Sequence, residues 1–237
     1  MIDLTNRSFN KELLDADNIP FDDIIQNMKE LNTVNTLLGG HAITISGIKN
    51  FLPINSNTIS ICEIGCGGGD NLQAIAAYFK EQKIKTIFIG IDIKQECIHF
   101  AKRQYPSLPA TWFTSDYAKV ELPDKPTIIF SSLFCHHFNE TELIEMLQWM
   151  KRNCSNGFFI NDLHRHPLAY YSIKFITALF SRSYLVKNDG PLSVARGFKK
   201  DEWKKLLSAA GIKDYSIQWK WAFRYLIVCK NGKGENV

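Results

Sequence analysis

From residue 58 onward, short apolar segments alternate with longer amphipathic segments, and this alternation constrains the fold most strongly. The apolar segments are rich in Ile and Phe, as buried strands are, and lie at 58–64, 86–92, 111–116, 127–133 and 157–163. Segments with helical periodicity lie at 70–82, 94–105 and 139–153. Strands of this kind separated by helices predict an α/β fold with a doubly wound, mostly parallel sheet covered on both faces.

The end of the chain departs from this alternation. A helix is expected at 199–211, and two apolar segments follow at 214–221 and 223–230. The few residues between these two segments cannot form a crossover, so the two strands must pair as an antiparallel hairpin. The parallel sheet is therefore expected to end in a hairpin.

The length of the chain is sufficient for one core. With 237 residues, 45% of them hydrophobic, we expect a single domain spanning 1–237. Helical spacing predicts one helix from Pro20 to position 38 and a shorter one at 41–52, so residues 1–52 are expected to form an N-terminal helical cap. Residues 164–198 form a long insertion with one expected helix at 167–181.

The sequence carries no signal that directs the chain to a membrane or out of the cell. No segment reaches the ~20 uncharged apolar residues that a membrane-spanning helix needs. The first residues lack the basic and apolar regions of a signal peptide. Six cysteines occur without a CxxC pair, which indicates reduced thiols. We therefore expect a cytoplasmic protein.

The sequence ICEIGCGGGDN at 61–71 places a glycine-rich loop after the first strand, where ligands bind in open α/β sheets. A dinucleotide-binding loop would have its third glycine at position 70, which is Asp70. A phosphate-binding loop would have a Lys after its last glycine, and none is present. Glu63 and Asp70 would repel a pyrophosphate, but they would tolerate a ligand that bears positive charge.

Two further acids follow the next two strands. Asp92 ends the second strand, where a carboxylate can accept hydrogen bonds from both hydroxyls of a ribose. Asp116 follows the third strand and could accept a hydrogen bond from the amine of adenine, with Ile93 or Tyr117 packing on the base.

The pattern Glu63-x-Gly65-x-Gly67-x-Gly69, followed by Asp92 and Ser115-Asp116, resembles the successive motifs of class I S-adenosylmethionine-dependent methyltransferases. The resemblance covers about residues 58–231 and implies a Rossmann-like methyltransferase fold, with a seven-stranded sheet and an antiparallel last strand. It implies S-adenosyl-L-methionine as the cofactor and S-adenosyl-L-homocysteine as the product. Thr127 departs from the pattern, because many members have Asp there.

The same resemblance implies a role for each motif. Glu63 and the loop amides would hold the methionyl part, Asp92 the ribose and Asp116 the adenine. The residues assigned to the cofactor in this way are Glu63, Gly65, Cys66, Gly67, Gly69, Asp92, Ile93, Asp116, Tyr117, Ser132 and Leu133.

The fourth strand leads into SSLFCHHF at 131–138, which lacks the motifs of enzymes that methylate nucleic acid bases. Leu-x-x-His-His instead resembles small-molecule methyltransferases. This resemblance implies methyl transfer to a small, largely apolar acceptor, by O-methylation of a phenol, an enol or a polyketide-like compound. Because a neutral imidazole accepts a proton near pH 7, His137 or His136 is the candidate general base. Alternatively, one of these rings packs and caps the following helix.

Several polar residues follow the fifth strand. Asp162, His164 and Arg165 leave the sheet at the same rim, and Arg196 lies later in the insertion, so we expect these four residues to contact the acceptor. The insertion at 164–198 resembles the substrate lid of the methyltransferases encoded beside type III polyketide synthases. Its aromatic residues suit an apolar acceptor or an ordinary core.

The histidine pairs raise the question of a metal. His164-x-His166 and His136-His137 are close in sequence, but adjacent histidines on a strand-like segment cannot easily point at one ion. Cys135 adds no ligand at a suitable spacing. We therefore expect no metal.

Charge is unevenly distributed along the chain. The net charge is +4, while residues 151–237 hold 16 basic and 6 acidic side chains. Such a surface is either simply solvated or attracts an anionic substrate or a membrane, so peripheral membrane contact stays open. No Arg-rich cluster with interleaved aromatics is present, so we expect no nucleic-acid partner, and no oligomeric state is predicted.

Three alternative functions stay open at this stage. They are a protein or RNA methyltransferase that uses the basic C-terminal third, a nicotinamide-dependent oxidoreductase, and a protein that binds the cofactor without catalysis.

Overall fold

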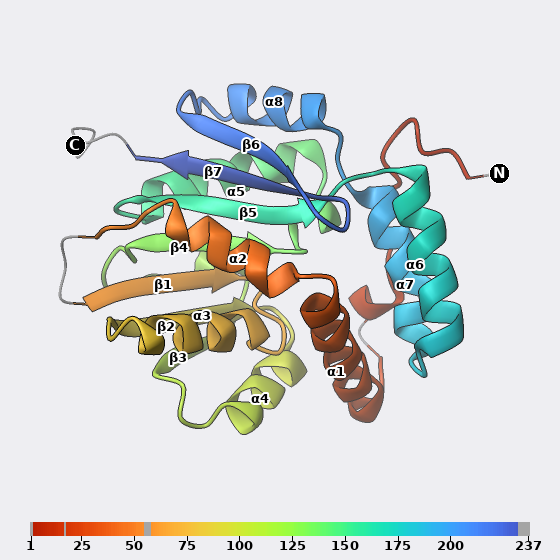
Figure 1. Cartoon of the computed structure of the whole chain (residues 1–237), viewed down its shortest axis with the longest axis horizontal. Helices are drawn as coiled ribbons and strands as arrows, with labels where there is room; N and C mark the ends of the chain where they lie inside the picture. The colour runs from red at the N-terminus through yellow and green to blue at the C-terminus, as the bar shows by residue number, and fades with distance from the viewer. Residues whose placement is uncertain (1, 17, 55–57, 232–237) are drawn as a thin grey trace.

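The protein contains a seven-stranded sheet in the order β3-β2-β1-β4-β5-β7-β6 (Figure 1). The computed structural model describes residues 2–16, 18–54 and 58–231. The strands are β1 Thr58–Ile64, β2 Lys85–Asp92, β3 Ala110–Thr114, β4 Ile128–Ser132, β5 Gly157–Leu163, β6 Tyr215–Lys220 and β7 Arg224–Lys230. Strands β1 to β5 pair in parallel, and β7 pairs antiparallel with both β5 and β6. The predicted α/β sheet with its C-terminal hairpin is confirmed.

Helices cover both faces of the sheet. They are α1 Phe21–Leu37, α2 Gly40–Lys49, α3 Asp70–Glu81, α4 Gln95–Gln104, α5 Glu140–Asn153, α6 Pro167–Phe180, α7 Tyr184–Arg196 and α8 Lys200–Ala209. Three short 3₁₀ helices are η1 Leu13–Asp15, η2 Tyr117–Lys119 and η3 Cys135–His137. None of these helices combines the length and apolar character needed to cross a bilayer.

Strand β1 shows why the central strands are almost continuously apolar. Ile59 and Ile61 pack on one face, in a core shared with α2 and α3. Cys62 and Ile64 pack on the other face, in a core shared with α5 and α8. Since both faces are buried, apolar side chains occupy both faces of the strand, from Ile59 and Ile61 on one side to Cys62 and Ile64 on the other. All six cysteines are buried without a disulfide.

The insertion after β5 differs from the prediction. One helix was expected in it, at 167–181, but the structure contains two, α6 and α7. Helix α7 includes Gly190 and Pro191, which disfavour a helix interior and concealed it in the sequence. Its start is capped by the Ser183 side chain, which accepts a hydrogen bond from the backbone N–H of Val186.

A layer of helices lies beyond the carboxyl ends of the parallel strands. In Figure 1, α1, α6 and α7 form this layer, and the segment before α1 runs alongside them. Helix α2, which was expected to belong to the N-terminal cap, packs instead on the sheet beside α3 and β5. The helical layer therefore combines α1 with the insertion after β5.

Candidate active site

A cavity of about 1010 Å³ lies where the carboxyl ends of the strands meet the helical layer. The predicted site residues that line it are Glu63, Gly65, Cys66, Gly67, Asp92, Ile93, Asp116, Tyr117, Ser132, Leu133, His136, His137 and Arg196. Four predicted residues do not line it: Gly69, Asp162, His164 and Arg165. The structure thus brings together most of the residues that the sequence assigned to the cofactor, and fewer of those assigned to the acceptor.

The glycine loop turns tightly along one wall of the cavity. Gly65 and Gly67 have φ values of +66° and +50°, which favour glycine. A Cβ at Gly65 would overlap the ring of Phe134, so the loop after β4 packs directly on it. Gly69 instead precedes α3, and a Cβ there would lie 2.6 Å from Trp112. Gly69 therefore serves packing, whereas Gly65 and Gly67 open the loop to the cavity.

Glu63 is only 1% exposed, and only one of its two carboxylate oxygens has a hydrogen-bond partner. Its Oε1 accepts a hydrogen bond of 2.9 Å from Asn71 Nδ2, while its Oε2 has no partner. Burial, with the nearby charges of Asp70 and Asp92, raises the pKa of Glu63 well above its ordinary value. A cationic ligand group placed at Oε2 would satisfy this atom and favour the ionised carboxylate.

Two further acidic residues, Asp92 and Asp116, lie at the same edge of the sheet as Glu63. Asp92 accepts hydrogen bonds from the backbone N–H groups of Gly67 (2.8 Å) and Lys94 (2.9 Å), and burial raises its pKa despite these bonds. Asp116 Oδ1 accepts from the backbone N–H of Ala118 at 3.0 Å and caps η2. Both carboxyl groups line the cavity, in the order that the sequence predicted.

Next to this wall, the loop after β4 carries the two histidines. Leu133 has a φ of +54°, which is strained for a β-branched or bulky side chain and is found mainly where structure around it enforces it. Its backbone N–H donates to the Asn161 carbonyl at 2.9 Å, which ties the turn to β5. The turn continues into η3, which contains His136 and His137.

His136 is buried, with 3% of its surface exposed, and is bound by acids on both sides. Nδ1 lies 2.8 Å from Asp162 Oδ1, and Nε2 lies 3.5 Å from Glu12 Oε1. Burial alone would lower its pKa, but Asp162 and then Glu12 raise it to about 9. His136 is therefore an imidazolium at neutral pH and cannot accept a proton there, which argues against its expected role as general base.

Asp162 also makes its hydrogen bonds to other parts of the protein, and it does not line the cavity. It accepts hydrogen bonds from the backbone N–H groups of Phe134 (3.2 Å) and Cys135 (2.7 Å) as well as from His136. Burial would raise its pKa, but the charge of His136 holds it below the ordinary value. Asp162 positions the loop after β4, so the expectation that it contacts the acceptor does not fit its placement.

His164 and Arg165 lie outside the cavity too. Arg165 is buried and binds Glu202 at 2.6 Å, and it donates to the backbone carbonyls of Leu4 and Thr5. His164 packs its ring against Tyr225, with 4.8 Å between the ring centroids. Arg165 thus attaches the N-terminal segment to α8, and neither residue is placed to contact an acceptor as expected.

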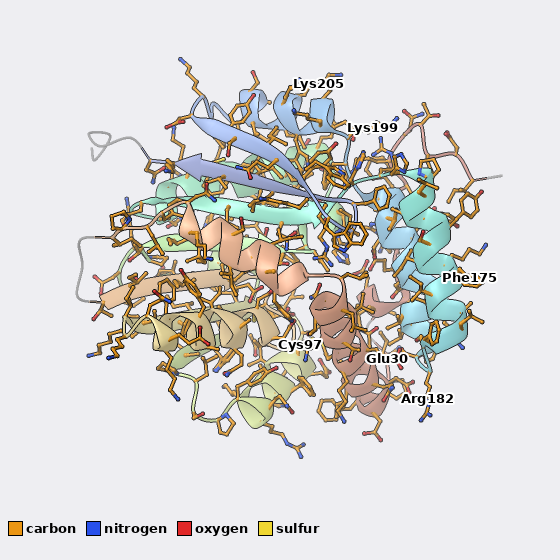
Figure 2. All side chains as sticks on the ribbon, in the orientation of Figure 1. Glu30, Cys97, Phe175, Arg182, Lys199 and Lys205 are labelled. Carbon is orange, nitrogen blue, oxygen red and sulfur yellow. The ribbon has the colours of Figure 1, made fainter. Side chains whose placement is uncertain are left out.

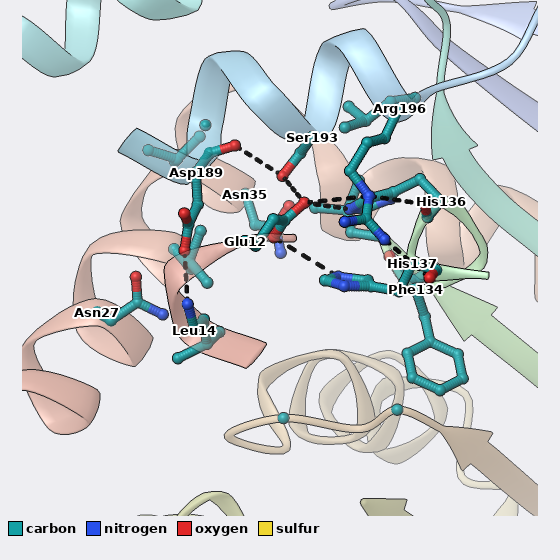
Figure 3. A pocket seen from close by; sticks show the side chains of 18 of the residues that line it. Glu12, Leu14, Asn27, Asn35, Phe134, His136, His137, Asp189, Ser193 and Arg196 are labelled. Atoms are coloured by element: carbon teal, nitrogen blue, oxygen red, sulfur yellow. Dashed lines mark hydrogen bonds and ion pairs between the residues drawn. The ribbon is translucent and has the colours of Figure 1, made fainter. Parts of the chain in front are cut away.

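His137 is the more accessible histidine, with 22% of its side chain exposed. Its Nδ1 lies 3.2 Å from Asp15 Oδ1. Its Nε2 lies 3.7 Å from Glu12 Oε2, a contact drawn in Figure 3. Glu12 also accepts a hydrogen bond of 2.7 Å from Ser193 Oγ. Sequence reasoning missed Glu12 and Asp15, because the segment that carries them has no recognisable motif.

Arg196 closes this end of the cavity. It donates to the backbone carbonyls of His136 at 3.0 Å and His137 at 2.8 Å, and its Nε lies 3.9 Å from Glu12 Oε1 (Figure 3). Burial would raise the pKa of Glu12, but His136 and then His137 hold it below the ordinary value. Glu12 is therefore ionised between two buried cations, His136 and Arg196.

Among the described residues, Glu12, His136 and His137 bring three metal-ligand atoms within 4.8 Å of one another. The expectation that two adjacent histidines cannot easily point at one ion is wrong, because η3 is a helical turn that directs both rings toward Glu12. The donor chemistry argues against it on other grounds. The Glu12 carboxylate already pairs with an imidazolium and a guanidinium, which would repel a metal ion.

Most of the rest of the cavity is apolar. Met28, Leu31, Val34 and Leu38 reach it from α1 and the end of that helix, Ile173 and Ile176 from α6, and Trp219, Trp221 and Phe223 from the β6–β7 hairpin. Asn27, Asn35 and Arg224 also line it. The cavity therefore has one wall formed by the glycine loop and its acids, one polar end around His137, and a mostly apolar remainder.

Comparisons with known proteins agree with this geometry. Residues 61–157 match a protein family described as "Methyltransferase domain". No curated protein sequence matches the chain significantly. Human N-acetylserotonin methyltransferase in complex with SAM has a TM-score of 0.63 and 18% identity, over 90% of this chain and 57% of that chain.

Two further solved structures match most of their own length. The plantazolicin methyltransferase BpumL, in complex with a triazolic desmethylPZN analogue and SAH, has a TM-score of 0.66 and 18% identity, covering 89% of this chain and 91% of that one. Magnesium protoporphyrin IX methyltransferase from Synechocystis PCC 6803 with bound SAH has a TM-score of 0.51 and 16% identity, covering 92% and 90%. These structures confirm the Rossmann-like fold.

The pairing of His136 predicts how stability depends on pH. Because folding raises its pKa from an ordinary value of ~6.5 to about 9, its stabilisation is complete below ~pH 6.5 and is lost as pH rises through about 9. Between about pH 6.5 and about pH 8.5, we expect wild-type protein to lose about 2 kcal/mol more unfolding free energy than His136→Gln.

Urea denaturation at both pH values measures this difference. His99→Gln, which changes an exposed histidine on α4, serves as the control and should follow the wild type. Parallel losses in wild type and His136→Gln would contradict the assignment of His136 as a buried imidazolium.

Proposed function

The chain carries an S-adenosylmethionine-dependent methyltransferase domain, and we propose that it methylates the oxygen of a small, largely apolar acceptor. The acceptor would be a phenol, an enol or a polyketide-like compound. The observation that carries this proposal is the position of His137, which lies between two carboxylates at the polar end of a cavity whose lining beyond the cofactor wall is mostly apolar.

The first wall of the cavity would hold the cofactor. Glu63, whose Oε2 lacks a partner, would receive the amino group of S-adenosylmethionine, and the Gly65–Gly67 turn would hold the methionyl chain. Asp92 would accept from the ribose hydroxyls and Asp116 from the adenine amine. Ile93, Tyr117, Ser132 and Leu133 would pack around these groups. The cofactor supplies an electrophilic methyl group on a sulfonium.

His137 would remove the proton of the acceptor hydroxyl. Its Nδ1 is close enough to Asp15 for a hydrogen bond at 3.2 Å, which sets the tautomer with the proton on Nδ1. Its Nε2 is 3.7 Å from Glu12, beyond hydrogen-bonding distance, so the lone pair on Nε2 is free to accept a proton. The carboxylates of Glu12 and Asp15 then stabilise the imidazolium that forms.

The helical layer would exclude water during the transfer. Helices α6 and α7 both line the cavity, which supports the role of residues 164–198 as a substrate lid. Helix α1 and the segment before it line the cavity as well, as an N-terminal cap would. An apolar acceptor would bury its hydrocarbon against these helices and direct its hydroxyl to His137.

The similar structures favour acceptors of this size. They include an N-acetylserotonin methyltransferase and a methyltransferase of the peptide natural product plantazolicin. The link to enzymes encoded beside polyketide synthases rests on the sequence resemblance alone. The alternative of a nicotinamide-dependent oxidoreductase has no support from the family match, which is to a methyltransferase domain.

The unpartnered oxygen of Glu63 generates the first prediction about the cofactor. Glu63→Gln keeps the shape and the hydrogen bond with Asn71 but cannot become an anion, so binding of S-adenosylmethionine should weaken about 10–100-fold. Isothermal titration calorimetry measures this change. Glu81→Gln, on the exposed end of α3, should bind as the wild type does.

Unfolding measurements separate binding from folding in this experiment. Because burial raises the pKa of Glu63 and so disfavours its charged form, replacing the carboxyl group with a neutral amide should leave the free energy of unfolding of Glu63→Gln close to that of the wild type. Wild-type affinity in Glu63→Gln would remove Glu63 from the cofactor site.

The role of His137 generates the second prediction. His137→Asn should lower kcat about 10²–10⁴-fold while leaving the affinity for S-adenosylmethionine unchanged, because the base acts on the acceptor alone. The assay uses methyl-labelled cofactor with a panel of phenols, quinols and alkylpyrones, and detects products by mass spectrometry.

His99→Asn, on the exposed face of α4, is the matched control and should retain full turnover. Unchanged kcat in His137→Asn would exclude His137 as the general base. If the methyl label appears in protein or RNA and in none of the small molecules of the panel, the proposed acceptor class is contradicted.

A further inference from the structure

Helix α6 carries an apolar face that is turned to solvent. Leu168, Tyr171, Phe175, Leu179 and Phe180 lie on it, with exposed fractions from 50% for Tyr171 to 78% for Phe180. We call these five residues the α6 face. Figures 1 and 2 show α6 at the outside of the molecule, with Phe175 on its outer side. A contiguous exposed apolar patch of this kind marks an interaction surface.

Cations border the α6 face, and an acidic side chain bound at its end is Glu30 of α1, which accepts hydrogen bonds from the backbone N–H groups of Arg182 and Ser183. Lys174 is the only charged residue of α6, and no acidic residue occurs from 164 to 188. Lys174, Arg182 and Lys187 are exposed beside the face or just beyond its end. An apolar helical face bordered by cations and aromatic side chains is characteristic of a helix that lies in a membrane interface.

The same helix also forms part of the cavity wall. Ala169, Ile173 and Ile176 of α6 line the cavity, while Phe175 and Leu179 of the α6 face do not. Ile176 is 37% exposed and lines the cavity as well, so it joins the two sides of the helix. The α6 face is therefore the outer side of a helix whose inner side forms part of the cavity wall.

We propose that the α6 face docks on an anionic lipid membrane, from which an apolar acceptor enters the cavity. The five side chains would lie among the acyl chains near the surface, and Lys174, Arg182 and Lys187 would contact anionic headgroups. The membrane docking stands on the surface alone, whereas the entry of an acceptor rests on the proposed function.

A second copy of the chain is a weaker candidate for this surface. Two α6 faces packed together would bring Lys174, Arg182 and Lys187 of both copies near one another, with no acidic residue of the 164–188 segment to offset them. Anionic headgroups offset these charges directly. The charge around the α6 face thus favours a lipid surface.

Vesicle co-sedimentation of the full chain tests the proposal. Wild-type protein should bind vesicles of phosphatidylcholine with phosphatidylglycerol, and bind pure phosphatidylcholine vesicles more weakly. Phe175→Ser combined with Leu179→Ser should reduce binding to the anionic vesicles at least about 10-fold, because two apolar side chains no longer leave water. Arg182→Glu should reduce it mainly at low salt.

Matched variants elsewhere on the surface serve as controls. Leu37→Ser changes an exposed leucine on α1, and Lys205→Glu makes the same change of charge on α8, away from α6 (Figure 2). Both should bind vesicles as the wild type does. Affinity for S-adenosylmethionine, measured without vesicles, should be the same in all variants.

The outcomes distinguish this proposal from the proposed function. If wild type binds no anionic vesicle but still binds S-adenosylmethionine, the docking proposal is wrong and the proposed function is untouched. If light scattering shows a dimer that Phe175→Ser with Leu179→Ser converts to a monomer, the α6 face is an interface between copies and the proposal is overturned. Vesicle binding without methyl transfer would support docking and count against the proposed function.

Discussion

The buried carboxylate of Asp162 fixes the geometry on which the acceptor end of the site depends. It accepts hydrogen bonds from Phe134, Cys135 and His136, so the loop after β4 is bound to the end of β5. A carboxylate taken out of water is stable only when several donors replace its hydration. The three donors from one short turn meet this need, and they hold that turn in the conformation that presents His137 to the cavity.

At the polar end of the cavity, Asp162 begins a series of neighbouring side chains whose charges alternate in sign. The His136 imidazolium lies between Asp162 and Glu12, and the Arg196 guanidinium approaches the same oxygen of Glu12 as His136 does. Each buried charge is thus offset by its neighbours, although the residues come from the N-terminal segment, the β4 loop, β5 and α7. Such a network is stable only when all four segments are in place. The polar end is therefore coupled to closure of the helical layer.

The way the site is assembled explains which of its parts the sequence could predict. The sheet and the cofactor wall were predictable because Glu63 and Asp92 directly follow the periodic pattern of their own strands. The acceptor end was not, since Glu12 lies in a segment with no pattern and reaches the site only through folding. His136 and His137 are the same residue type at adjacent positions, and only their buried partners separate an imidazolium from a candidate base.

The cavity thus joins a cofactor wall set by local sequence to an acceptor end set by tertiary contacts, and the Oε2 atom of Glu63 in the cofactor wall has no partner. A crystal structure of the protein with S-adenosyl-L-homocysteine tests this account most directly. We expect the amino nitrogen of the ligand within hydrogen-bonding distance of Glu63 Oε2, the ribose at Asp92, and the sulfur facing the end of the cavity that contains His137. A ligand bound elsewhere, or with Glu63 Oε2 still unpartnered, would contradict it.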